Sequence, residues 1–221
     1  MKSYKVLFEK TAHYSTIGEP GKKIKYIWIV CHGYGQLASL IIHKFDGFDN
    51  GEHFILAPEG LSRFYWNRSS PNPVGSSWMT KVNRLDEIAD YTRYIKKLYD
   101  EYVPQMADNL EIILFGFSQG CATQIRWLMG TFPKFHHLVL WGGLLPEDLD
   151  YTPHTEYFSN KNLYWVYGNE DQFLEQKHID WHHKFMEEQS LNFETIKFEG
   201  KHRIDRKVLH DLFLRIQDSG K

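Results

Sequence analysis

The stretch that decides the fold runs from Glu111 to Gly130 and reads Glu-Ile-Ile-Leu-Phe-Gly-Phe-Ser-Gln-Gly-Cys-Ala-Thr-Gln-Ile-Arg-Trp-Leu-Met-Gly. Its first part is a short apolar run rich in β-forming residues, which is typical of a strand buried on both faces. A helical pattern follows the Gly-Phe-Ser-Gln-Gly pentapeptide and reaches Met129, and Gly130 is expected to stop that helix. The order predicts a strand, a tight turn that carries Ser118, and a helix.

Between a strand and a helix, the Gly-x-Ser-x-Gly pentapeptide is typical of a turn that exposes a nucleophilic serine. Glycines two residues to either side of Ser118 permit a turn too tight for a side chain, and they leave the serine hydroxyl exposed beyond the strand. The amide of Gln119 begins the helix and points toward the same place. The pattern therefore predicts a nucleophilic serine. The alternative is a glycine-rich turn kept for packing.

The composition narrows the class of protein. The 221 residues suffice for one domain with a substantial core, and we expect a single domain over residues 1–221. The 26 basic and 28 acidic side chains nearly cancel, which argues against nucleic acid or an anionic membrane as a partner. We see neither a membrane-spanning apolar run nor a signal peptide. The two cysteines are not expected to pair, so a cytoplasmic location is predicted.

Elsewhere the chain alternates strand patterns with helical ones. Runs typical of strands lie at 26–31, 53–57, 137–141, 163–167 and 193–198, with one or two edge strands expected within 4–17. That alternation predicts an α/β fold with a mostly parallel central sheet and helices on both faces. Ligands of such sheets bind beyond the carboxyl ends of the strands, so the acids and histidines that directly follow a strand are the candidates for chemistry.

Acids and histidines after the later strands can complete a catalytic triad. A serine becomes nucleophilic when a histidine takes its proton and a carboxylate orients that histidine. Where this pentapeptide is catalytic, the chain order is serine, then acid, then histidine. Asp171 lies in the turn after an apolar strand, with Glu170 as second choice and Glu147 less favoured, and His202 directly follows the last strand. We therefore predict a triad of Ser118, Asp171 and His202.

A second group of histidines offers a different chemistry. His178 and His182 are four residues apart in a predicted helix, a spacing that can bind a metal ion. The sequence lacks the glutamate of a His-Glu-x-x-His motif and an obvious third ligand. A metallohydrolase is therefore the less favoured alternative, and a solvated helix face is favoured. We expect no metal and no cofactor.

The developing negative charge on a substrate oxygen needs two amide donors, which form an oxyanion hole. The Gln119 amide is one. The second is expected from the loop His32-Gly33-Tyr34-Gly35, whose glycines let the backbone approach a substrate, and the Tyr34 amide is the best candidate. His32 precedes the serine, so we expect it to brace this loop by hydrogen bonding and not to act as the base.

A long aromatic segment, residues 61–82, shows no clear periodicity and contains Trp66, Trp78 and Met79. Long irregular connections inside compact domains are uncommon and tend to be functional. We expect this segment to be a substrate-binding loop whose three named side chains line an apolar acyl pocket. A heavily aromatic core is the alternative reading of the composition.

Five motifs span nearly the whole chain: His-Gly-Tyr-Gly-Gln, Ala-Pro-Glu-Gly, Gly-Phe-Ser-Gln-Gly, Tyr-Gly-Asn-Glu-Asp and Gly-Lys-His. Taken together, they resemble the phospholipase/carboxylesterase family of α/β-hydrolases, which includes carboxylesterases and acyl-protein thioesterases. The resemblance implies the same triad and oxyanion hole, and it implies that Trp78 lies beside the acyl pocket.

The chain departs from the family pattern at three places. Cys121 stands where a second glycine is common, Lys201 stands before the histidine, and Tyr167-Gly168 replaces the usual His-Gly. These departures remove no catalytic group, so they bear on substrate preference. Cys121 as a second nucleophile or redox switch is less favoured than a small side chain packed under the turn.

The sequence thus predicts a serine hydrolase that cleaves carboxylic esters or thioesters through an acyl-enzyme on Ser118. Acyl-protein thioesterase and lysophospholipase activities are alternatives within this class. A catalytically inactive binding module on the same fold is an alternative of another class. The expected substrate is a small-molecule acyl ester or thioester, and the acyl length, leaving group and oligomeric state stay open, with a homodimer as one candidate.

Overall fold

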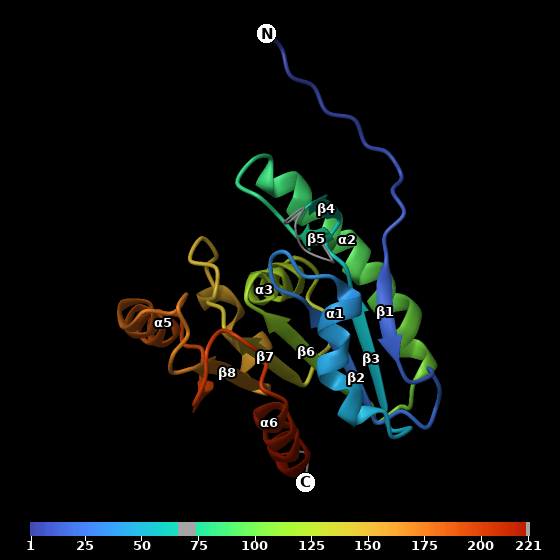
Figure 1. Ribbon diagram of the computed structural model, residues 1–221, viewed down its shortest axis with the longest axis vertical. Coiled ribbons are helices and arrows are strands. Elements are labelled where there is room, and N and C mark those ends of the chain that lie inside the picture. Colours follow the sequence, from blue (N-terminus) through green and yellow to red (C-terminus); the bar gives the residue numbers. More distant parts are fainter. Residues whose placement is uncertain (66–73, 220–221) are drawn as a thin grey trace.

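The computed structural model describes residues 1–65 and 74–219, and its centre is a seven-stranded sheet (Figure 1). The sheet order is β1-β3-β2-β6-β7-β8-β9, and all neighbours are parallel except β1 with β3. Its strands are β1 (Tyr14–Ile17), β2 (Tyr26–Cys31), β3 (His53–Pro58), β6 (Glu111–Phe117), β7 (His137–Trp141), β8 (Asn162–Gly168) and β9 (Phe193–Phe198). The predicted α/β fold with a mostly parallel sheet is confirmed.

Helices cover both faces of this sheet, as the continuous apolar strands require. The helices are α1 (Ala38–Ile41), α2 (Arg84–Tyr102), α3 (Gln119–Thr131), α4 (Thr155–Ser159), α5 (Gln176–Glu188) and α6 (Arg206–Ser219), with 3-10 turns η1 (Ile42–Phe48), η2 (Val103–Gln105) and η3 (Thr152–His154). One core cluster joins the sheet to α2, α3 and α5, and the other joins it to α1, η1 and α6.

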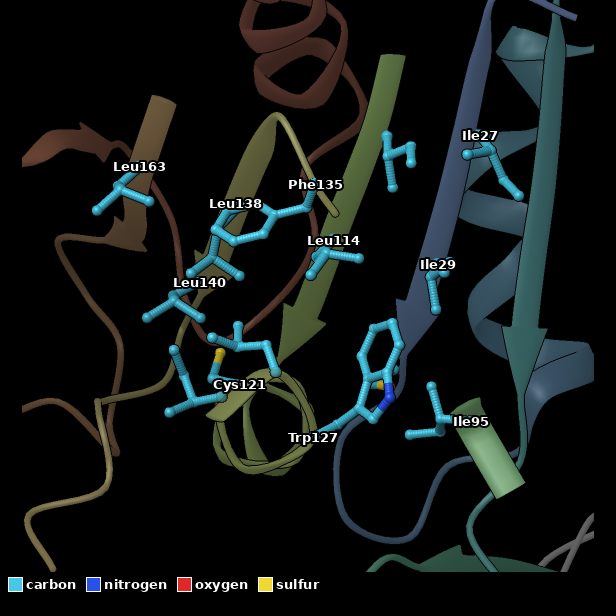
Figure 2. Packing of buried hydrophobic residues seen from close by; sticks show 14 of the residues in the cluster. Ile27, Ile29, Ile95, Leu114, Cys121, Trp127, Phe135, Leu138, Leu140 and Leu163 are labelled. Carbon is cyan, nitrogen blue, oxygen red and sulfur yellow. The ribbon is translucent and has the colours of Figure 1, made fainter. Parts of the chain in front are cut away.

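Alternate residues of each central strand enter the two cores. In β2, Ile27 and Ile29 belong to the first cluster, whereas Trp28 and Val30 belong to the second. Figure 2 shows the first cluster, in which Ile29 faces the helical layer that carries Trp127. Because side chains of a strand alternate between its faces, burial of both faces explains why these strands read as unbroken apolar runs.

Helix α3 continues beyond the glycine that was expected to end it. Its last residue is Thr131, and the chain leaves the helix at Phe132, which has φ 46° and donates its amide to the Leu128 carbonyl at 2.8 Å. The left-handed conformation is costly for a phenylalanine. Contacts of the Phe132 ring with His154 and Tyr157, at 4.9 and 5.1 Å between ring centroids, offset that cost.

At the amino end, one strand forms, Tyr14–Ile17, which agrees with the one or two edge strands expected within residues 4–17. Strand β3, the partner of β1, ends at Pro58, opposite Tyr14. Pairing therefore stops after one further bond, in which the Glu59 amide donates to the His13 carbonyl at 2.9 Å. The residues before His13 lie outside the sheet and extend away from it (Figure 1).

The described parts of the segment 61–82, residues 61–65 and 74–82, are more regular than the sequence indicates. Strands β4 (Ser62–Tyr65) and β5 (Val74–Ser77) form a separate antiparallel pair. A bridge between Ser76 and Gln36 joins this pair to the loop after β2. Such pairing satisfies backbone groups that an irregular loop would leave to solvent, and this corrects the expectation of an irregular connection.

None of the helices formed by residues 1–65 and 74–219 has the length and apolar character of a membrane span.

Candidate active site

Ser118 occupies a strained turn between β6 and α3. Its backbone has φ 53° and ψ −116°, a combination that residues with side chains rarely adopt. Its amide donates to the Trp141 carbonyl at 2.8 Å. A Cβ atom at Gly116 would lie 2.5 Å from the Gly120 oxygen, and one at Gly120 would lie 2.0 Å from the Cys31 oxygen. The turn therefore requires both glycines of the pentapeptide.

Asp171 and His202 are in direct contact. The Nδ1 atom of His202 lies 2.6 Å from Oδ2 of Asp171, and the two side chains are only 11% and 1% exposed. The other carboxylate oxygen accepts the Phe173 amide at 2.9 Å. A carboxylate can only accept, so the imidazole proton lies on Nδ1 and leaves Nε2 able to accept a proton. The two alternative acids, Glu170 and Glu147, are exposed.

The loops beside Ser118 bring this pair to the same end of the sheet. Gly142 directly follows Trp141, the residue that accepts the Ser118 amide, and a Cβ atom there would lie 3.2 Å from Cε1 of His202. The Phe117 ring, next to Ser118 in the chain, lies 4.9 Å from the imidazole. The serine, the acid and the histidine follow strands β6, β8 and β9, and they converge at the carboxyl edge.

The loop after β2 passes over the serine. A Cβ atom at Gly33 would lie 3.2 Å from Cβ of Ser118, so the backbone here approaches as closely as the glycine permits. The loop is held by the Gly35 amide, which donates to the Ser76 carbonyl at 2.9 Å. Tyr34 is 52% exposed, and its ring stacks on Phe64 at 5.2 Å.

His32 braces the same loop from below. Its Nε2 accepts the Gly60 amide at 2.9 Å, and its Nδ1 therefore donates to the Gly33 carbonyl at 2.7 Å. Burial lowers the pKa of His32 to about 4, which keeps the ring neutral and able to serve in both bonds at neutral pH. The geometry agrees with the structural role expected for this histidine.

Gln119 contributes through its side chain as well as through its position. It begins α3, where the first amides have no partner within the helix. Its Nε2 donates to the Met79 carbonyl at 2.9 Å, and its Oε1 accepts the Trp78 amide at 3.2 Å. The pentapeptide indicated only the backbone role, because a contact 40 residues away in the chain leaves no local signal.

The substrate-binding residues predicted in 61–82 have three different outcomes. Trp78 is 1% exposed and donates its indole N–H to the His32 carbonyl at 2.9 Å, so it supports the loop instead of lining an open pocket. The side chain of Trp78 therefore lies in the core, and its role in substrate binding stays a prediction. Met79 is partly buried beside it. Trp66 lies outside the described residues.

The histidine pair in α5 is not a solvated face. His182 is fully buried, accepts the Leu145 amide at 3.1 Å and packs on Trp165 at 4.3 Å. Burial lowers the pKa of His182 to about 3. Among residues 1–65 and 74–219, no group of three or more His, Cys, Asp or Glu side chains is placed to hold a metal ion.

Cys121 packs beneath the serine turn. Its thiol is fully buried and donates to the Gly116 carbonyl at 3.1 Å. Burial raises the pKa of this thiol far above its ordinary value. Cys31 is also buried, and the two cysteines are unpaired.

A parallel sheet with helices on both faces and a serine on a strained strand-to-helix turn define an α/β-hydrolase. A family model described as Phospholipase/Carboxylesterase matches residues 12–218. The chain therefore belongs to the phospholipase/carboxylesterase family, whose members hydrolyse carboxylic esters and thioesters. No curated protein sequence matches it.

Solved structures share this fold at low sequence identity. Acyl-protein thioesterase 2 of Zea mays is 13% identical with a TM-score of 0.72, over 94% of this chain and 99% of that one. The phospholipase/carboxylesterase of Dyadobacter fermentans is 17% identical with a TM-score of 0.63, over 95% of this chain and 100% of that one. Esterase PE8 is 12% identical with a TM-score of 0.69, over 95% of this chain and 99% of that one. At these identities the likeness concerns the fold.

Proposed function

We propose that the protein cleaves carboxylic esters or thioesters through an acyl-enzyme on Ser118, with His202 as the base and Asp171 as the residue that orients it. The observation that carries the proposal is the 2.6 Å contact between Nδ1 of His202 and Oδ2 of Asp171, beside the strained serine turn. That contact leaves Nε2 as the atom that can accept the serine proton.

In the first half-reaction Oγ of Ser118 attacks the substrate carbonyl, and its proton passes to Nε2 of His202. The amides of Gln119 and Tyr34 stabilise the resulting oxyanion, and Asp171 stabilises the imidazolium. The tetrahedral intermediate then breaks the bond to the leaving group. His202 returns the proton to the departing alcohol or thiol.

In the second half-reaction water attacks the acyl-enzyme and gives its proton to His202. The new tetrahedral intermediate expels Ser118, which recovers the proton, and the carboxylic acid is released. Every proton thus passes through one imidazole nitrogen, so the protein needs no cofactor for this sequence of steps. Met79, which is partly buried and whose carbonyl accepts the Gln119 side chain, is the candidate for the acyl-binding wall among the described residues.

A fluorophosphonate probe and a panel of p-nitrophenyl esters and acyl thioesters test this proposal. We expect the wild-type protein to be labelled and to hydrolyse members of the panel. Ser118→Ala should abolish both, whereas Ser159→Ala, an exposed serine on α4, should abolish neither. The ratio of ester to thioester rates separates a carboxylesterase from a thioesterase.

Full hydrolysis by a folded Ser118→Ala variant would overturn the mechanism. A folded wild-type protein that neither reacts with the probe nor turns over the panel would instead favour a binding module on the hydrolase fold. A lysophospholipid in the panel tests the remaining alternative within the class. The cytoplasmic location and the homodimer stay predictions from the sequence.

A further inference from the structure

The imidazole of His202 lies between two phenyl rings from different parts of the chain. Phe117 approaches with a ring-centroid distance of 4.9 Å and an interplanar angle of 36°. Phe173 forms a T-shaped pair with the imidazole, at 4.7 Å between ring centroids and an interplanar angle of 72°. Phe117 is 5% exposed, so the core holds it in place, but Phe173 is 63% exposed. The imidazole thus has a core ring on one side and a surface ring on another.

The turn that carries Phe173 also holds the acid. The Phe173 amide donates to Oδ1 of Asp171 at 2.9 Å, while Oδ2 of the same carboxylate contacts His202. The next residue, Leu174, is buried in the core and donates its amide to the Asp171 carbonyl at 3.1 Å. Asp171 and Leu174 therefore fix the backbone of Phe173, and the ring is placed over His202 without being buried itself.

A large apolar side chain that stays mostly exposed gains little from burial. Next to the imidazole, however, its position has two physical effects. It restricts rotation of the ring that must keep Nδ1 aimed at Asp171, and it keeps water away from a hydrogen bond whose strength depends on a low local dielectric. Both effects act on His202, and neither requires Phe173 to touch a substrate.

We propose that Phe173 is a positioning residue, which holds His202 in the orientation that its hydrogen bond with Asp171 requires and shields that bond from water. The proposal rests on the proposed function in one respect, since it takes His202 as the base. The sequence does not single out Phe173, because Asp171-Gln172-Phe173 is typical of an ordinary turn.

The test compares Phe173→Ala with Phe173→Leu, which restores much of the apolar volume. Phe8→Ala is the matched control, because it removes a phenyl ring that is 78% exposed in the amino-terminal segment. Two kinds of measurement, one kinetic and one spectroscopic, are made on each protein. The first is the pair kcat and KM for a small ester, p-nitrophenyl acetate. The second is the downfield proton NMR signal of the His202 Nδ1 hydrogen and its exchange rate with water, which requires no turnover.

We expect Phe173→Ala to lower kcat by about tenfold, the effect of one aromatic contact, with KM changed less than about twofold. The Nδ1 proton should exchange faster or broaden beyond detection. Phe173→Leu should recover most of both properties, and Phe8→Ala should match the wild type. Thermal unfolding should be nearly the same in all four proteins, because the ring is exposed.

A Phe173→Ala variant with unchanged kcat and an unchanged Nδ1 signal would overturn the proposal. So would a change confined to KM, which would mean that the ring contacts substrate. Failure of the proposed function is recognised separately, by a wild-type protein that the fluorophosphonate probe does not label. In that case the proton exchange rate alone still decides whether Phe173 shields the pair.

Discussion

Nδ1 of His202 and Oδ2 of Asp171 lie 2.6 Å apart, although the two residues are separated by 31 positions in the chain. The contact forms because strands β8 and β9 are parallel neighbours, so the segments that follow them leave the sheet at the same edge. Gly200 strengthens this arrangement, since its carbonyl accepts the Glu170 amide at 2.9 Å. The sheet register therefore sets the geometry of the Asp171–His202 pair.

Asp171→Asn is expected to lower kcat for ester hydrolysis by about four orders of magnitude. Asparagine keeps the shape of the side chain but can donate to Nδ1, which puts the imidazole proton on Nε2 and removes the acceptor for the serine proton. Steady-state kinetics measure the effect, and circular dichroism confirms the fold. Glu170→Gln, an exposed neighbour that also loses one charge, is the control and should stay near wild-type activity. Activity of Asp171→Asn within tenfold of wild type would contradict the role given to Asp171.

The Gln119→Ala variant tests the role of the Gln119 side chain separately from that of the Gln119 backbone amide. The substitution keeps the backbone N–H proposed for the oxyanion hole, but it removes the bonds to the Trp78 amide and the Met79 carbonyl. We expect the free energy of unfolding in urea to fall by about 1 to 3 kcal/mol, because buried polar groups lose their partners. Gln172→Ala, at an exposed position, should change it little. Equal stabilities of the two variants would show that the Gln119 side-chain bonds to Trp78 and Met79 contribute nothing to stability.

The buried histidines make the fold sensitive to acid. In the folded state burial lowers the pKa of His32 to about 4 and that of His182 to about 3, whereas an unfolded histidine titrates near 6.5. Between those values the unfolded chain binds protons that the folded chain does not. Their contribution to stability is therefore complete above about pH 6.5 and is lost as the pH falls toward 4, by roughly 2 to 3 kcal/mol for each histidine at pH 4.5.

Urea unfolding at pH 7.5, 5.5 and 4.5 measures this dependence. His182→Gln retains an acceptor for the Leu145 amide but no longer titrates, so its stability should fall less steeply with pH than that of the wild type. A variant with the same slope as the wild type would exclude His182 as a source of the acid sensitivity.

The thiols of Cys31 and Cys121 should resist modification in the folded protein. Both are fully buried, and burial raises the pKa of each above its ordinary value, so the reactive thiolate is scarce. We expect a disulfide exchange reagent to label neither thiol in buffer within minutes and to label both in denaturant. Cys121→Ala should keep most of the esterase activity. Rapid labelling of native Cys121, or loss of turnover in Cys121→Ala, would favour the redox-switch alternative.

Several features were predictable from the sequence because each depends on neighbouring residues. A tight turn needs the glycines that flank Ser118, and a strand buried on both faces reads as an apolar run. Asp171 follows an apolar run and His202 follows the last expected strand, and these positions predicted that the two residues would meet. Parallel strands place their carboxyl ends at one edge of the sheet, which brings the two residues near each other, and the register of β8 against β9 sets the contact itself.

Other features could not be predicted because they depend on contacts between distant segments. Trp78 was expected at a pocket wall, yet its indole lies in the core because a carbonyl of the β2 loop accepts its N–H. His182 was expected in solvent, yet the Leu145 amide and the Trp165 ring enclose it. The local sequence around an aromatic residue or a histidine does not indicate whether its side chain is buried or exposed. The packing of distant segments decides this.

The sequence by itself determined the alternation of the central strands with helices, the tight turn at Ser118 and the candidates for acid and base. The reason is that periodicity and glycine spacing depend on residues only a few positions apart, so they do not require contacts between distant segments. Only the tertiary structure decided that the Gln119 side chain binds the backbone of Trp78 and Met79, and that Phe173 lies against His202. Those contacts require segments tens of residues apart to pack in one register, and that register is set by the whole sheet.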